Sequence, residues 1–177
     1  MAASVPTQDD LYREATMRFG AALERLARAY EPDTDSSCDL LQDINVALWR
    51  SFSGFNGLCS LRTWVYRVAH NVATSHLTRR RRMGGRTLVS LEDVEHLPDL
   101  DEGEQAAERQ DALRRLLTLI RQLKIPDRQV MLAYLEGMDA AEIGEITGLS
   151  AGSVATRIHR AKHVLARRFE DGRHHGE

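Results

Sequence analysis

The stretch DAAEIGEITGLSAGSVATRIHRAKHVLARR, from Asp139 to Arg168, decides the fold of the C-terminal part of this chain. Asp139 is a good helix N-cap, and Glu142 three residues later completes a capping box. Gly148 supplies the left-handed residue that ends a first short helix, and Ser150 then caps a second, longer one. Two capped helices around a glycine turn predict a helix-turn-helix.

The second helix has one apolar side and one basic side. Its apolar residues recur at three- and four-residue spacing: Val154, Ile158, Ala161 and Leu165. From Ala151 to Arg168 there are five Lys or Arg residues and no acid. Gly144 also fits the motif, because a small residue there lets the two helix backbones approach closely. The alternative is an ordinary helical hairpin with a solvated basic face, but the caps, both glycines and the unbroken positive face together favour a helix-turn-helix.

Composition excludes several classes of protein. A chain of 177 residues has room for one or two domains. It contains no apolar run near the roughly 20 residues that span a bilayer, and its first residues have neither the positive flank nor the apolar segment of a secretory signal. Cys38 and Cys59 are too few for a disulfide framework, which suggests reduced thiols. We therefore expect a cytoplasmic protein without membrane insertion.

Three helices are predicted before residue 83. Apolar residues recur at helical spacing from Leu11 to Tyr30, from about Cys38 to Phe52, and from Leu61 to about Arg80. Pro32 ends the first helix, because proline cannot continue the hydrogen-bond ladder. The segment from Ser53 to Ser60 contains two glycines and little periodicity, so it is predicted to be a loop. No stretch alternates as a β-strand does.

Charge is unevenly distributed along the chain, although the net charge is only −2. From Arg62 to Arg86 there are seven arginines and no acid, whereas from Glu92 to Asp111 nine acids accompany Arg109 alone. Gly84, Gly85, Pro98 and the density of acids indicate a flexible acidic linker. The predicted fold is all-α, with two small helical domains at residues 8–83 and 108–170 joined by a linker at residues 84–107.

This arrangement resembles the bacterial sigma factors of the sigma-70 family. DLLQDINVALW (Asp39 to Trp49), FNG (Phe55 to Gly57) and LRTWVYRVAHNVA (Leu61 to Ala73) look like sigma region 2, and the segment that begins LKIPDRQV at Leu123 looks like region 4. A chain with only these two regions resembles the extracytoplasmic-function (ECF, group 4) sigma factors. The resemblance implies a protein that binds core RNA polymerase and directs promoter-specific transcription initiation. The sequence has no phosphate-binding glycine loop and no nucleophile motif, so we expect neither catalysis nor a cofactor.

The resemblance also implies partners and site residues. Region 2 of the family binds the clamp helices of the polymerase β′ subunit, and Asp39, Gln42 and Asp43 offer acceptors for that contact; the alternative is a solvated acidic face. Region 4 reads the minus-35 element beside the β flap, and an anti-sigma factor is the family's usual regulator. Expected minus-ten contacts are Ser53, Asn56, Leu58, Arg62, Arg67, His70, Asn71, Arg79 and Arg80. Expected minus-35 contacts are Ser153, Thr156, Arg157, His159, Arg160 and Lys162.

Some positions depart from the family pattern or stay open. Asn56, Leu58 and Ala155 stand where the family usually has charged residues, so we expect a promoter that differs from the family's commonest one. Trp64 and Tyr66 fit a core position as well as a base-stacking platform.

Other functions fit the sequence less well. His159 and His163 have the spacing of metal ligands but no evident third ligand, so no metal site is predicted. The alternative function is a helix-turn-helix regulator with an N-terminal sensing or dimerisation domain. A third possibility is an interaction module with an acidic surface.

Overall fold

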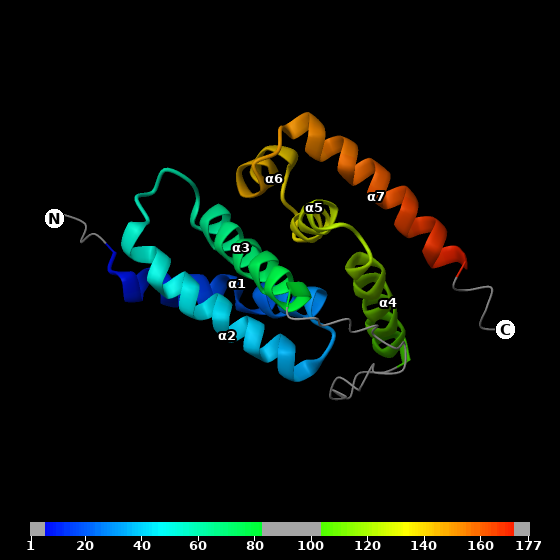
Figure 1. The fold of residues 1–177 in the computed structure, drawn as a ribbon, viewed down its shortest axis with the longest axis horizontal. Helices are drawn as coiled ribbons and strands as arrows, with labels where there is room; N and C mark the ends of the chain where they lie inside the picture. The colour runs from blue at the N-terminus through cyan, green and yellow to red at the C-terminus, as the bar shows by residue number, and fades with distance from the viewer. Residues whose placement is uncertain (1–5, 83–103, 172–177) are drawn as a thin grey trace.

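The protein is described by a computed structural model, in which residues 6–82 and 104–171 are placed. Every regular element in these two ranges is helical and none is a strand, so the all-α prediction is confirmed (Figure 1). The elements are α1 (Gln8–Tyr30), α2 (Thr34–Ser51), the 3-10 turn η1 (Phe52–Gly54), α3 (Leu61–Arg82), α4 (Glu104–Arg121), α5 (Ile125–Leu135), α6 (Ala140–Thr147) and α7 (Ala151–Asp171). No helix in the placed ranges is long and apolar enough to cross a membrane.

Local side-chain caps determine where the N-terminal helices begin. Thr7 and Asp10 form a reciprocal capping box at the start of α1. Helix α2 begins at Thr34, four residues before the predicted start at Cys38, because the carboxylate of Asp33 accepts the N–H of Ser36 and caps the chain there. Ser60 plays the same part for α3, where its hydroxyl accepts the N–H of Thr63 at 3.0 Å.

The helix-turn-helix has the predicted caps and glycines. Asp139 and Glu142 form the capping box of α6, and Gly148 ends that helix with a φ of 74°. A Cβ added at Gly144 would lie 2.7 Å from the carbonyl oxygen of Leu149, so only glycine permits this close approach of the turn backbone. The hydroxyl of Ser150 then caps α7 by accepting the N–H of Ser153.

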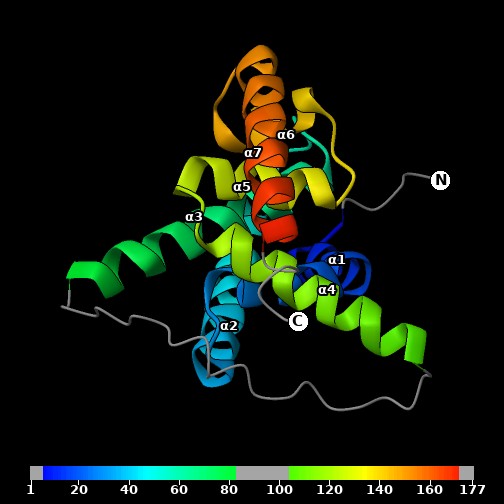
Figure 2. The ribbon, with the colours of Figure 1, turned by 90° about the vertical axis from the view of Figure 1, so that its right-hand side faces the viewer.

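The N-terminal and C-terminal helices pack against one another. Helix α4 lies along α1, while α5 and α6 contact α3 (Figures 1 and 2). Buried residues from both halves, such as Leu26 of α1 and Ile120 of α4, belong to one hydrophobic cluster. Helix α4 starts at Glu104, four residues before the predicted second domain. Residues 84–103 of the predicted linker lie outside the described residues.

Candidate functional site

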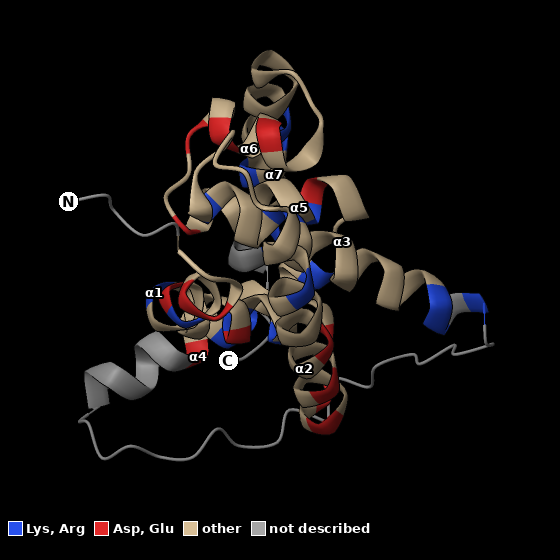
Figure 3. Cartoon of the chain, turned by 90° about the vertical axis from the view of Figure 1, so that its left-hand side faces the viewer, with Lys and Arg blue, Asp and Glu red and all other residues tan. Residues whose placement is uncertain are grey.

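The outer side of α2 carries the residues predicted to bind polymerase. Leu40, Ile44 and Leu48 are fully buried and hold the helix against α1 and α3. Since Asp39, Gln42 and Asp43 fall on the other side of the same helix, all three are exposed. Acidic residues colour this side of α2 in Figure 3. The structure therefore brings the three predicted residues together on one accessible face.

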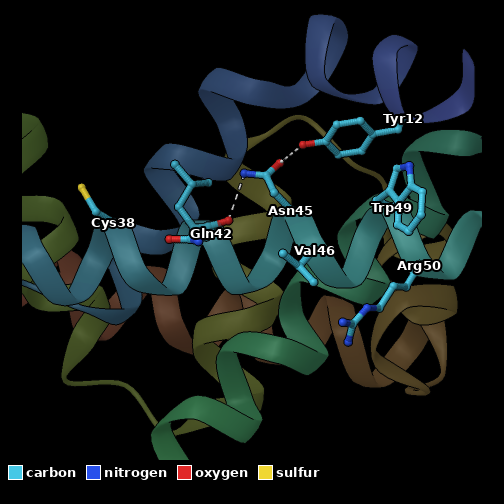
Figure 4. Close-up of a pocket in the computed structure, with 8 residues that line it drawn as sticks. Tyr12, Cys38, Gln42, Asn45, Val46, Trp49 and Arg50 are labelled. Carbon is cyan, nitrogen blue, oxygen red and sulfur yellow. Dashed lines mark hydrogen bonds between the residues drawn. The ribbon is translucent and has the colours of Figure 1, made fainter. Parts of the chain in front are cut away.

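An apolar groove of about 620 Å³ lies on α2 next to these acceptors, and the sequence interpretation did not find it (Figure 4). Val46 and Trp49 remain 44% and 43% exposed in it. Tyr12 of α1 forms another wall, and its hydroxyl donates to the side-chain oxygen of Asn45 at 3.3 Å. Large apolar side chains that stay this exposed are typical anchor points for a protein partner. The sequence did carry one sign of this exposure, because Val46 and Trp49 do not fall on the buried apolar face of α2.

The indole of Trp49 is fixed in the groove. Its N–H donates to the carboxylate of Asp9 at 2.8 Å, and the side chain of Gln8 donates to the Trp49 carbonyl at 2.6 Å. Cys38 lines the far end of the groove as a free thiol. The start of α1 thus holds an aromatic side chain in place while leaving its face open.

The loop after α2 presents three of the predicted minus-ten residues. Ser53, Asn56 and Leu58 are exposed, and Leu58 reaches 87% exposure. Asn56 accepts the N–H of Leu58 at 3.2 Å, which shapes the tip of the loop.

Aromatic packing supports this loop from beneath. Phe55 packs edge-on against Trp64, with ring centroids 5.4 Å apart, and the Trp64 N–H donates to the hydroxyl of Ser51 at 2.9 Å. Tyr66, in contrast, is only 2% exposed. Tyr66 is therefore a core residue, and Trp64 buttresses the loop.

The predicted minus-ten residues on α3 are found in different environments. Asn71 and Arg79 are exposed. Arg62 and Arg67 donate to backbone carbonyls of the C-terminal half, at Glu136 and Glu145. They are half-buried in this contact.

Arg80 forms an ion pair with Glu31, a carboxylate that is 1% exposed and that also contacts His76 at 2.9 Å. A buried carboxylate requires such partners, because leaving water without them costs several kcal/mol. Arg80 therefore has a structural role in this conformation.

His70 does not lie where the sequence interpretation placed it. It is 1% exposed, and its Nδ1 is 3.1 Å from the hydroxyl of Tyr30 in the core. Burial lowers the pKa of His70 to about 4, so the ring is neutral near pH 7. The available signal was its spacing, since His70 lies four residues after Tyr66 and three before Ala73, which are buried on the same face of α3. We correct the prediction and remove His70 from the minus-ten set.

Helix α7 exposes most of its predicted DNA-reading face. Thr156, His159 and Arg160 are exposed and Ser153 is half-buried. Two other predicted residues have partners within the domain. Arg157 pairs with Asp127 at 2.6 Å, and the ammonium of Lys162 lies over the ring of Tyr134, 4.4 Å from its centroid.

His159 and His163 stack edge-on with ring centroids 4.6 Å apart. In the placed part of the chain, no three His, Cys, Asp or Glu side chains gather as metal ligands would.

Comparisons with known proteins agree with this geometry. The family description "Sigma-70 region 2" matches residues 16–83, and "Sigma-70, region 4" matches residues 113–165. The RNA polymerase sigma factor CnrH of Cupriavidus metallidurans is 30% identical over 162 residues, which cover 88% of this chain and 84% of that protein. The ECF RNA polymerase sigma-E factor of Haemophilus influenzae is 29% identical over 139 residues, covering 75% of this chain and 74% of that protein.

Two solved structures share the fold. The structure of CnrH in complex with the cytosolic domain of CnrY has a TM-score of 0.65 at 23% identity and covers 90% of this chain and 88% of that one. The sigma factor RpoE in complex with the anti-sigma factor NepR from Bartonella quintana has a TM-score of 0.71 at 20% identity, covering 93% and 98%.

The chain belongs to the sigma-70 family and, within it, to the ECF sigma factors. It is a DNA-binding factor that directs core RNA polymerase to initiate transcription.

Proposed function

We propose that the outer face of α2 is the surface by which this sigma factor binds core RNA polymerase, at the β′ clamp helices. The observation that carries this proposal is the row of exposed acceptors beside the apolar groove of Val46 and Trp49. Interfaces gain most of their affinity from a few large side chains in a desolvated centre, while charges at the rim fix orientation. A helix with both features suits a basic, partly apolar helical partner.

The remaining assignments divide the DNA contacts between the two halves. The exposed loop residues Ser53, Asn56 and Leu58 form a pocket for an unpaired base of the minus-ten element, supported by Trp64. Arg62, Arg67, Asn71 and Arg79 follow the phosphates of that strand. Helix α7 reads the minus-35 element as duplex through Ser153, Thr156, His159 and Arg160, with Arg157 and Lys162 beside the phosphates.

The similar solved structures support an anti-sigma factor as a further partner of this chain. CnrH was solved with the cytosolic domain of CnrY, and RpoE with the anti-sigma factor NepR. A partner of that kind would keep this chain from polymerase until a signal released it. The protein would act in the cytoplasm, through binding rather than catalysis.

Charge reversal on α2 tests the polymerase surface. Asp39→Lys and Asp43→Lys should each weaken binding to purified core polymerase by about tenfold, because each places a cation where the partner is basic. Glu14→Lys is the matched control, since Glu14 is exposed on α1 and pairs with Arg18 of the same helix. Affinity is measured by fluorescence anisotropy, and circular dichroism checks the fold. Unchanged affinity in both α2 variants would remove this face from the interface.

A further inference from the structure

Two arginines of α3 meet the C-terminal ends of two helices from the other half of the chain. The guanidinium of Arg62 donates to the carbonyl oxygen of Glu136, the residue that caps α5. The guanidinium of Arg67 donates twice to the carbonyl oxygen of Glu145 in the last turn of α6, at 2.8 and 3.1 Å. Carbonyls at a helix C-terminus lack intrahelical partners and carry partial negative charge. They therefore attract an arginine much as a phosphate oxygen does.

A third arginine holds the same helix end from α1. The guanidinium of Arg25 binds both carboxylate oxygens of Glu136, at 3.0 and 2.9 Å. This pair joins residues 111 positions apart in the sequence, and the side chain of Glu136 is 22% exposed. Bonding to Glu136 raises the pKa of Arg25 above its ordinary value. Glu136 thus contacts α1 through its side chain and α3 through its backbone.

We propose that the ends of α5 and α6 compete with the minus-ten strand for Arg62 and Arg67, an inference that rests on the assignment of these arginines to that strand. In the free chain the carbonyls of Glu136 and Glu145 occupy the donors that phosphates would use. The Arg25–Glu136 pair keeps them there. The strand binds only when the C-terminal helices leave α3, so the free sigma factor has low affinity for single-stranded DNA.

Loosening the Arg25–Glu136 pair should increase the open population. Arg25→Glu places two carboxylates against each other, and Glu136→Arg places two guanidinium groups together. The double variant R25E/E136R restores an opposite-charge pair in the reverse order. Arg18→Glu is the matched control, because it makes the same charge change on α1 at a residue that pairs with Glu14. Glu136→Gln is a milder variant that keeps the shape if a reversal disturbs folding.

The probe is a fluorescein-labelled single-stranded DNA of mixed sequence and roughly 12 nucleotides, which suits a backbone-tracking groove. Apparent affinity is proportional to the open population, so R25E should bind the strand about fivefold more tightly than R18E. Small-angle X-ray scattering should show a larger radius of gyration for R25E. The double variant should return both values to wild type.

The salt dependence identifies the donors that are released. Each added phosphate contact on a single strand steepens the plot of log affinity against log salt by about 0.7. Because the strand contacts Arg62 and Arg67 in the bound state of the wild type as well as of R25E, the contribution of these contacts to the slope should be the same in both. Adding Arg62→Ala and Arg67→Ala to R25E should remove two phosphate contacts and make its slope shallower by about 1.4.

The outcomes separate this inference from the proposed function. If R25E stays closed, or opens without binding the strand more tightly than R18E, competition at the two arginines is wrong. If Arg62→Ala and Arg67→Ala in the otherwise native chain leave promoter-specific transcription unchanged, the minus-ten assignment itself is wrong. Lost transcription in those variants together with an unresponsive R25E would overturn the competition alone.

Discussion

His70 shows how one residue links burial to the pH dependence of stability. Its ring is fully buried, its Nε2 has no hydrogen-bond partner among the described residues, and its pKa is lowered to about 4. A histidine in the unfolded chain has a pKa of about 6.5, so below that pH it binds a proton while the buried ring of the folded chain stays neutral. His70 should therefore leave the free energy of unfolding unchanged above pH 6.5. As the pH drops from 6.5 toward 4, this group should lower the free energy of unfolding by on the order of 3 kcal/mol.

The pH profile of a His70→Phe variant tests that account. Phenylalanine keeps an aromatic ring in the core but cannot bind a proton. Chemical denaturation at a series of pH values should show a shallower loss of stability between pH 6.5 and 4 than in the wild type. His159→Phe controls for the loss of an exposed imidazole. Parallel wild-type and His70→Phe profiles would contradict the assignment.

Residues on α7 should separate into those that read bases and those that hold phosphates. A side chain that reads a base edge contributes about 1–3 kcal/mol of discrimination. We expect at least one of Thr156→Ala, His159→Ala and Arg160→Ala to change the ranking of minus-35 variants in transcription assays. Lys162→Ala should weaken all of them alike. Equal losses on every promoter in all four variants would make α7 an electrostatic clamp that reads no sequence.

At the scale of elements, the α6–α7 turn depends on glycine at two positions for different reasons. Gly148→Ala places a side chain at a φ of 74°, which costs about 1–2 kcal/mol. Gly144→Ala puts a Cβ 2.7 Å from the Leu149 carbonyl oxygen, and overpacking of this kind costs about 1–3 kcal/mol.

Gly152→Ala is the control for both turn variants. Gly152 lies in the first turn of α7 with no neighbour within 4 Å, so alanine there should stabilise by up to about 1 kcal/mol. Thermal denaturation of the three variants gives the comparison. If all three variants were destabilised by a similar amount, neither the positive φ of Gly148 nor the close contact at Gly144 would explain the effect.

Elements set by local chemistry were predictable from sequence, and surfaces set by distant contacts were not. Asp139, Glu142 and Gly148 act on residues a few positions away, so the helix-turn-helix was found with its correct caps. The apolar repeat predicts that α2 starts at about Cys38, four residues late, because the cap supplied by Asp33 lies before the first apolar residue of that repeat. The pattern of α2 indicates that Val46 and Trp49 are exposed, but the groove around them also needs Tyr12 of another helix, which that pattern cannot reveal.

Across the whole molecule, packing between the two halves gives the arginines of α3 partners that their sequence positions do not suggest. The basic run of α3 suggested a continuous track for a nucleic-acid strand. In the folded chain Arg62 and Arg67 instead contact α5 and α6, while Arg80 pairs with the buried Glu31. These partners lie tens of residues away, and helical periodicity carries no information about them. How much of the proposed minus-ten surface is accessible therefore depends on where the C-terminal helices lie.

Reconstituted transcription tests the central claim most directly. Core RNA polymerase from the source organism, mixed with this chain and fragmented genomic DNA, should start transcripts at discrete sites. Those sites should share one motif at the minus-ten position and another at minus-35, and Asp39→Lys or Asp43→Lys should reduce all of them together. Absence of defined starts, combined with an operator-like footprint of the chain alone on duplex DNA, would contradict the account and favour a helix-turn-helix regulator.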